Sequence, residues 1–339
     1  MALLIMTVVQ RGFPMTFDLE LNNPSLFWTV QGEEDLPLPM PLIESNPLLS
    51  SILPFTRYFE LYSNYVGARF AIWVTVPPNY ATHSDCCYPV IYLTDGNVTV
   101  PQTATYQLLS IDPIYPIRPF ILVGVGYAGE DARYQLALRA RDLRPPGEPI
   151  PKGVSEASMQ RLVELGILDS VGVKFYLHYL NNSAGDQFHA FLSEELHPRL
   201  VEQYRIEPDT AGLFGYSYGG LFSTYVALQQ SPLFHRIGAG SPGLIPQQSK
   251  IFELYQAELD NAADHAHRWF HLTVCQSELM NCSYYYSLVG QGTVALLELL
   301  RHSPLKKLRF SSQIIAQESH NTGFMASWFS FLRTCYAAK

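Results

Sequence analysis

The sequence predicts an α/β fold in which helices cover both faces of a mostly parallel β-sheet. Short apolar runs recur without alternation, as at 89–93 and 120–125. Such runs are typical of strands that are buried on both faces of a parallel sheet. Helical periodicity lies between the runs: Phe188, Leu192 and Leu196 are spaced by four and form one apolar face. This alternation of strand and helix favours a parallel sheet with crossover helices.

The expected strands share a short apolar or β-branched run that stops at Pro, Gly or a polar turn. They are 69–76, 89–93, 120–125, 211–214, 236–239, 271–275 and 308–316. A helix is expected over 155–165. Pro198 is expected to kink or split the helix that contains Phe188, because proline cannot donate a hydrogen bond inside a helix.

A Gly-rich turn follows the strand 211–214. It reads Gly-Tyr-Ser-Tyr-Gly at 215–219 and matches G-x-S-x-G. Glycine flanks the serine because the turn is too tight for side chains, and the turn lifts the hydroxyl to the positive end of the next helix. In this strand–turn–helix setting the motif indicates an α/β-hydrolase fold with Ser217 as the nucleophile.

A serine hydroxyl is a weak nucleophile unless a base takes its proton. In this fold the catalytic residues follow the chain order serine, acid, histidine, and the histidine comes after the last strand. Of the ten histidines, His320 directly follows the strand 308–316, whereas His302 precedes it. The order along the chain therefore predicts His320 as the base.

The acid should lie just past the strand that ends near Cys275, where Glu278 stands. A carboxylate there would hold the imidazole tautomer and stabilise the imidazolium. Two alternatives stay open at this point. One is Glu318, in the same loop as the histidine, and the other is a serine–histidine pair oriented by a carbonyl or by Gln276.

The tetrahedral oxyanion of acyl transfer needs backbone N–H donors. One is expected from Tyr218, the residue after the nucleophile, and the other from Asn97, in the turn after the strand 89–93. Gly96 would aim the amide of Asn97 inward. An ordinary turn at Asp95-Gly96 is the alternative.

Aromatic and cationic side chains near these motifs could contact a substrate. Tyr127 and Tyr216 are expected to line the site, with core packing as the alternative in a chain that is 13% aromatic. Arg141 could anchor an acidic substrate, and pairing with Asp142 is its alternative.

The 339 residues are expected to form an irregular N-terminal arm over 1–55 and one catalytic domain over 56–339. The segment 145–182 begins with three prolines and a glycine and breaks the strand–helix alternation. It is a candidate lid, or a plain surface loop, near the edge of the sheet where open α/β sheets bind ligands.

Composition excludes some partners. The net charge is −8, and no cluster of Lys and Arg suits nucleic acid. The apolar run 2–9 is too short to span a bilayer and lacks the basic start and cleavage site of a signal peptide. The five cysteines include no C-x-x-C pair for zinc or redox chemistry. Mostly reduced thiols favour an intracellular, cytoplasmic protein.

Several ordered blocks resemble the putative esterase family of α/β-hydrolases. The string YPVIYLTDGN at 88–97 is similar to the family's YPVLYLLDG block, and VGVGY at 123–127, RARDLRP at 139–145 and FGYSYGGLF at 214–222 also correspond. This family includes enterochelin and related siderophore esterases, feruloyl esterases and S-formylglutathione hydrolase, and mycolyltransferases belong to the same wider group. The resemblance covers about 57–335 and departs from the family at Ser319-His320-Asn321, where DHG is common.

The resemblance implies a serine esterase without metal or cofactor that acts on a small-molecule ester, such as a siderophore-like ester or a lactone. It also implies the serine, histidine and oxyanion-hole assignments given above. An acyltransferase, thioesterase or cyclase could use the same acyl-serine. A binding protein that has kept the fold and lost the chemistry is the third alternative.

Overall fold

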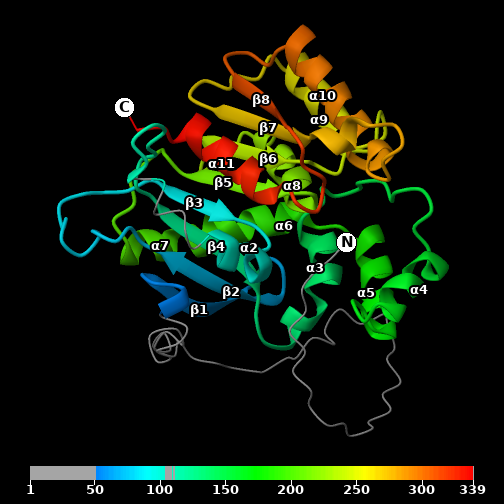
Figure 1. Cartoon of the computed structure of the whole chain (residues 1–339), viewed down its shortest axis with the longest axis horizontal. Coiled ribbons are helices and arrows are strands. Elements are labelled where there is room, and N and C mark those ends of the chain that lie inside the picture. Colours follow the sequence, from blue (N-terminus) through cyan, green and yellow to red (C-terminus); the bar gives the residue numbers. More distant parts are fainter. Residues whose placement is uncertain (1–50, 104–108, 110, 339) are drawn as a thin grey trace, which may run out of the picture. The chain divides into compact units, whose positions relative to one another are not determined.

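The structure is a computed structural model that describes residues 51–103, 109 and 111–338 (Figure 1). In this part of the chain one eight-stranded sheet has the order β1-β2-β4-β3-β5-β6-β7-β8. The strands are β1 Thr56–Ser63, β2 Ala68–Thr75, β3 Val90–Leu93, β4 Ile121–Tyr127, β5 Gly212–Tyr216, β6 Arg236–Gly240, β7 Trp269–Cys275 and β8 Arg309–Ile315. β2 pairs antiparallel with β1 and β4, and all other neighbours are parallel. The mostly parallel sheet expected from the sequence is confirmed.

Helices connect the strands and cover the sheet. They are α2 Gly96–Thr103, α3 Gln135–Asp142, α4 Glu156–Glu164, α5 Ser170–Asn181, α6 Gly185–Ala190, α7 His197–Gln203, α8 Tyr218–Ala227, α9 Lys250–Asp260, α10 Gln291–His302 and α11 Phe324–Cys335. Short 3₁₀ turns span Gly129–Tyr134 and Gln276–Leu279, and π-helical turns span Phe191–Leu196 and Tyr286–Gly290. The helical run that contains Phe188 passes from α6 through the π-helical turn into α7, and its backbone stays helical at both junctions. Pro198 lies in the first turn of α7, and a kink or split at this proline stays a prediction.

Each face of the sheet has its own core, as the continuous apolar strands require. In β3, Val90 and Tyr92 pack into the larger cluster with α3, α6, α8 and α9, whereas Ile91 and Leu93 pack into the cluster under α11. All four side chains are at most 1% exposed. The period of two in β3 therefore fills two separate cores, one above and one below the sheet.

The candidate lid segment 145–182 contains α4 and α5. α5 packs against α3, and the buried Arg144 guanidinium at the start of the segment donates hydrogen bonds to the carbonyls of Leu180 (2.7 Å) and Glu148 (2.8 Å). These bonds fasten both ends of the segment to the same side chain. Movement as a lid stays a prediction.

Most of the expected N-terminal arm, residues 1–50, lies outside the described residues, and β1 begins at Thr56. Among the helices of the described residues, none combines the length and the apolar character needed to cross a bilayer. The five cysteines, all within the described part, are unpaired.

Candidate active site

Ser217 occupies a strained turn between β5 and α8. Its φ is 59° and its ψ is −116°, a conformation that L-residues rarely adopt. The flanking glycines are sterically required: a Cβ at Gly215 would overlap the carbonyl of Gly219, and a Cβ at Gly219 would overlap the Thr94 hydroxyl. The Ser217 amide donates a 2.9 Å hydrogen bond to the carbonyl of Gly240 in the neighbouring strand. The turn is therefore held in place by the sheet on both sides.

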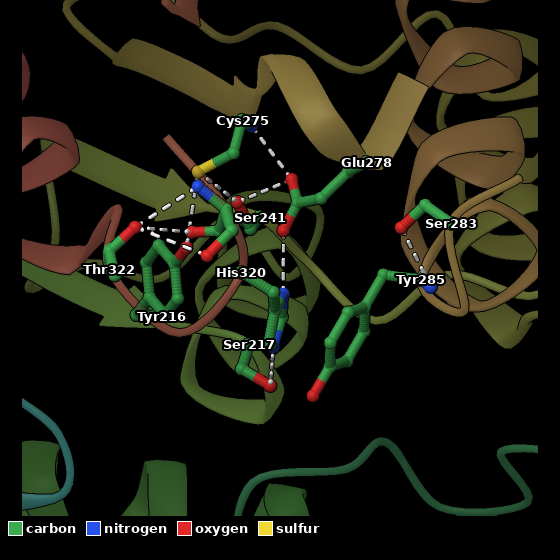
Figure 2. Close-up of polar contacts among 10 residues, drawn as sticks. Tyr216, Ser217, Ser241, Cys275, Glu278, Ser283, Tyr285, His320 and Thr322 are labelled. Atoms are coloured by element: carbon green, nitrogen blue, oxygen red, sulfur yellow. Dashed lines mark hydrogen bonds and ion pairs between the residues drawn. The ribbon is translucent and has the colours of Figure 1, made fainter. Parts of the chain in front are cut away.

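The structure brings Ser217, His320 and Glu278 together in one hydrogen-bonded chain (Figure 2). The Ser217 hydroxyl lies 3.0 Å from Nε2 of His320, and Nδ1 of His320 lies 2.6 Å from Oε1 of Glu278. His320 is in the loop between β8 and α11, and Glu278 is in the 3₁₀ turn directly after β7. With Nδ1–H donating to the carboxylate, Nε2 presents its lone pair to the serine hydroxyl.

The Glu278 side chain is 0% exposed, and both of its oxygens have partners. Oε1 accepts from His320, while Oε2 accepts from the Cys275 amide (2.7 Å) and the Ser241 hydroxyl (2.8 Å). A buried carboxylate needs such donors to offset the loss of its hydration. The acid is thereby fixed in position and in rotation.

Cys275 and Tyr216 form the wall behind this carboxylate. The Tyr216 hydroxyl lies 3.3 Å from the Cys275 sulfur, and Ser241 reaches the same sulfur at 3.6 Å. Burial raises the pKa of the Cys275 thiol, and burial together with the Glu278 charge raises the pKa of Tyr216 far above its usual range. Both groups stay neutral, so they add no second anion next to the acid. Tyr216 was expected to line the substrate site, but its hydroxyl points toward the Cys275 sulfur.

The two expected oxyanion donors lie at adjacent helix starts. Tyr218 is the first residue of α8, so its amide has no acceptor within the helix. Asn97 is the second residue of α2, and its side chain anchors that helix to β4: Nδ2 donates to the Tyr127 carbonyl (2.9 Å) and Oδ1 accepts from the Tyr127 amide (2.7 Å). Thr94, which directly follows β3, lies against Gly219 in the turn that carries Ser217. The amide of Asn97 as a donor stays a prediction.

The predicted substrate residues Arg141 and Tyr127 both contact the fully buried Asp142. The guanidinium of Arg141 forms two hydrogen bonds to the carboxylate, at 2.6 and 3.0 Å, and the Tyr127 hydroxyl donates at 3.1 Å. The structure thus has the pairing with Asp142 that was the alternative for Arg141. A substrate contact by either residue stays a prediction.

Arg139, two residues before Arg141 in α3, pairs with Asp95 in the same bidentate way, at 2.8 and 2.9 Å. Its guanidinium lies 5.1 Å from the ring centre of Tyr218, and the Tyr218 hydroxyl lies 3.0 Å from that of Tyr176 in α5. The candidate lid segment therefore touches the residue that follows Ser217.

Sequence reasoning missed Tyr285. Its ring stacks on the His320 imidazole, with ring centres 4.0 Å apart and planes inclined by 19°. The only sequence signal is a run of three tyrosines at 284–286, which has no periodicity and no motif. The part of the chain that the structure describes contains no group of three or more His, Cys, Asp or Glu side chains placed to hold a metal ion.

Comparisons with known proteins show what this chain is similar to. The family model described as "putative esterase" matches residues 167–281, a segment that includes the nucleophile turn and Glu278. The ferri-bacillibactin esterase BesA of Bacillus subtilis is 30% identical over 159 residues, which are 46% of this chain and 48% of that protein. The apo-salmochelin esterase of Escherichia coli O6:H1 is 25% identical over 179 residues, 52% of this chain and 48% of that protein. These matches span about half the length of each relative.

Among solved structures, the BES protein from Bacillus cereus superposes with a TM-score of 0.64 at 24% identity, over 84% of this chain and 97% of the other. The α/β-hydrolase fold predicted from the sequence is confirmed. The motif blocks, the family match and the two esterase relatives agree with one another: this chain is similar to the putative esterase family of α/β-hydrolases.

Proposed function

We propose that this chain is a serine esterase that hydrolyses a carboxylic ester through an acyl-Ser217 intermediate. One observation carries the proposal: a continuous hydrogen-bonded chain runs from the Ser217 hydroxyl through His320 to the buried Glu278 carboxylate. A nucleophile, a base and an orienting acid in this geometry are the parts that acyl transfer needs.

In acylation, Nε2 of His320 takes the proton of Ser217 as Oγ attacks the ester carbonyl. The developing oxyanion accepts hydrogen bonds from the amides of Tyr218 and Asn97, each donor contributing about 3 to 4 kcal/mol to the transition state. His320 then gives its proton to the leaving alcohol oxygen, and the C–O bond breaks. Glu278 stabilises the imidazolium throughout without taking its proton.

In deacylation, a water molecule takes the place of the alcohol. Nε2 removes one proton from the water, the hydroxide attacks the acyl carbonyl, and the same two amides hold the oxyanion. The proton returns to Oγ as the carboxylic acid leaves. Each residue therefore acts twice per turnover.

For the substrate, we propose a siderophore-like ester or lactone. Support comes from the two relatives, whose names describe esterases of ferri-bacillibactin and apo-salmochelin. Tyr218, Tyr176 and Arg139 offer aromatic and cationic surface next to the nucleophile turn, which suits an aromatic acyl group.

The test is a panel of p-nitrophenyl esters, thioesters and catecholate trilactones, assayed with the wild type and with Ser217→Ala. We expect kcat to fall by at least about 10⁴-fold in the variant, as expected for loss of a serine nucleophile. A fluorophosphonate probe should add to Ser217 and to no other serine in peptide mapping. Full turnover by Ser217→Ala would overturn the proposal.

Ser223→Ala is the matched control, because Ser223 is a buried serine of α8 whose hydroxyl has no hydrogen-bond partner in the described structure. It should keep wild-type kcat. Adding an alcohol acceptor during turnover separates hydrolysis from acyl transfer: a transferase would form a new ester at the expense of free acid, whereas an esterase keeps releasing the acid.

A further inference from the structure

The imidazole of His320 lies between two tyrosine rings (Figure 2). Tyr285 stacks on one side, with ring centres 4.0 Å apart and planes inclined by 19°. Tyr216 lies on the other side at 5.4 Å and 41°. With both rings in place, His320 is only 9% exposed although it belongs to a loop.

A base in a loop needs more than one contact to hold its plane. The hydrogen bond to Glu278 restrains Nδ1, but the torsion about the bond between Cβ and the ring has a broad energy minimum in histidine, and a rotation about it moves both ring nitrogens together. Such a rotation would turn the lone pair of Nε2 away from the Ser217 hydroxyl. A flat group against the face of the ring resists it.

The backbone of Tyr285 is itself held firmly. Its amide donates to the Ser283 hydroxyl at 3.2 Å, and its carbonyl accepts from the amides of Val289 (2.9 Å) and Gly290 (3.1 Å). A Cβ at Gly290 would overlap the carbonyl of Glu278. The turn that carries the acid and the turn that carries Tyr285 therefore pack as one unit, so the two groups keep a fixed relation to each other.

We infer that Tyr285 is a positioning residue for the base: its ring fixes the plane of the His320 imidazole while Glu278 fixes its direction. The negative face of the ring also favours the imidazolium that forms in each half-reaction. This inference rests on the proposed esterase function and deepens it, because it assigns a residue that acts through the base and not through the substrate.

The test compares Tyr285→Leu with Tyr285→Phe in pre-steady-state assays with p-nitrophenyl esters. In Tyr285→Leu, the acylation and deacylation rates should both fall by about tenfold, the size of an aromatic contact of this kind, with KM nearly unchanged. Tyr285→Phe keeps the ring and should stay within about twofold of the wild type. The fluorophosphonate labelling rate should fall by the same factor as acylation, because labelling uses the same base.

Tyr284→Leu is the matched control. Tyr284 is the adjacent residue and is 76% exposed, and its ring meets Tyr285 edge-on and has no ring contact with His320 in the described structure. It should leave both rates unchanged. In a His320→Ala background, Tyr285→Leu should have no further effect, because a residue that acts through the base loses its influence when the base is gone.

Several outcomes would overturn the inference. These are wild-type rates in Tyr285→Leu, an equal loss in Tyr285→Phe, a loss confined to acylation, or an undiminished loss in the His320→Ala background. The proposed function fails separately, if the wild type neither hydrolyses esters nor reacts with the probe at Ser217. A melting temperature measured for each variant shows whether a loss of rate comes from unfolding.

Discussion

Glu278→Gln changes one hydrogen-bonding group in a fully buried site and tests the proposed relay directly. Oε2 of Glu278 accepts from the Cys275 amide at 2.7 Å and from the Ser241 hydroxyl at 2.8 Å. A backbone amide can only donate, so the glutamine must place its carbonyl oxygen there. Its NH₂ group then faces Nδ1 of His320, where the carboxylate oxygen stood.

This arrangement imposes the wrong tautomer on the imidazole. Nδ1 of His320 must accept from the glutamine NH₂ and so carries no proton, and Nε2 becomes the N–H donor toward the Ser217 hydroxyl. A protonated Nε2 cannot take the serine proton. We expect kcat to fall by about 10³ to 10⁴, or about 4 to 5.5 kcal/mol of transition-state stabilisation, as in other triads whose acid is replaced by its amide.

The assay is steady-state hydrolysis of one p-nitrophenyl ester by the wild type, Glu278→Gln and Glu278→Ala. The alanine variant should retain more activity than the glutamine variant, because it leaves the imidazole free to choose its tautomer. Glu318→Gln is the control: Glu318 shares the loop of His320, and in the described structure the two ring nitrogens of His320 contact Glu278 and Ser217 instead. Activity of Glu278→Gln within tenfold of the wild type, or a thousandfold loss in Glu318→Gln, would refute the relay.

Two further predictions concern stability. Burial raises the pKa of Glu148 from 4.5 to about 7, so its contribution to stability is complete below pH 4.5 and is lost as the pH rises through 7. Glu148→Gln should remove this pH dependence. The difference in the free energy of unfolding between the variant and the wild type, measured by urea unfolding, should change by up to about 3 kcal/mol between pH 4.5 and 8. A difference that stays constant with pH would contradict the prediction. Gly215→Ala should destabilise by about 2 kcal/mol or more in thermal melts, because its methyl would overlap the Gly219 carbonyl. Gly243→Ala, with its nearest contact at 3.7 Å, is the control, and an equal loss there would refute the steric argument.

Ser217 could be predicted from the sequence because the requirement is local. The two glycines, the apolar strand before them and the helix after them all lie within about a dozen residues. Each of them is required by the steric constraints of a single turn. His320 was predicted by a weaker argument, its order after the last strand. That argument works because the order of the strands along the chain follows from the fold alone and requires no knowledge of side-chain contacts.

The sequence predicted where along the chain the acid should lie, but it did not decide between Glu278 and Glu318. Glu278 is separated from His320 by 42 residues, and nothing in the sequence shows that its carboxylate reaches Nδ1 while that of Glu318 does not. The difference lies in the donors around the carboxylate: the Cys275 amide at the end of β7 and the hydroxyl of Ser241, the residue directly after β6. Tyr285 lay beyond sequence reasoning for the same reason, because stacking on a ring far along the chain leaves no local pattern.

The parallel register of the sheet explains how such distant residues meet. Ser217 follows β5 by one residue, Glu278 follows β7 by three and His320 follows β8 by five. Cys275 and Ile315, the last residues of β7 and β8, are paired neighbours, so the acid and the base leave the sheet from the same level. The carboxyl ends of parallel strands share one edge, and short connections from that edge have little freedom. The strand register therefore brings the three side chains close together. The stacked ring of Tyr285 and the buried donors to Glu278 then determine their final positions.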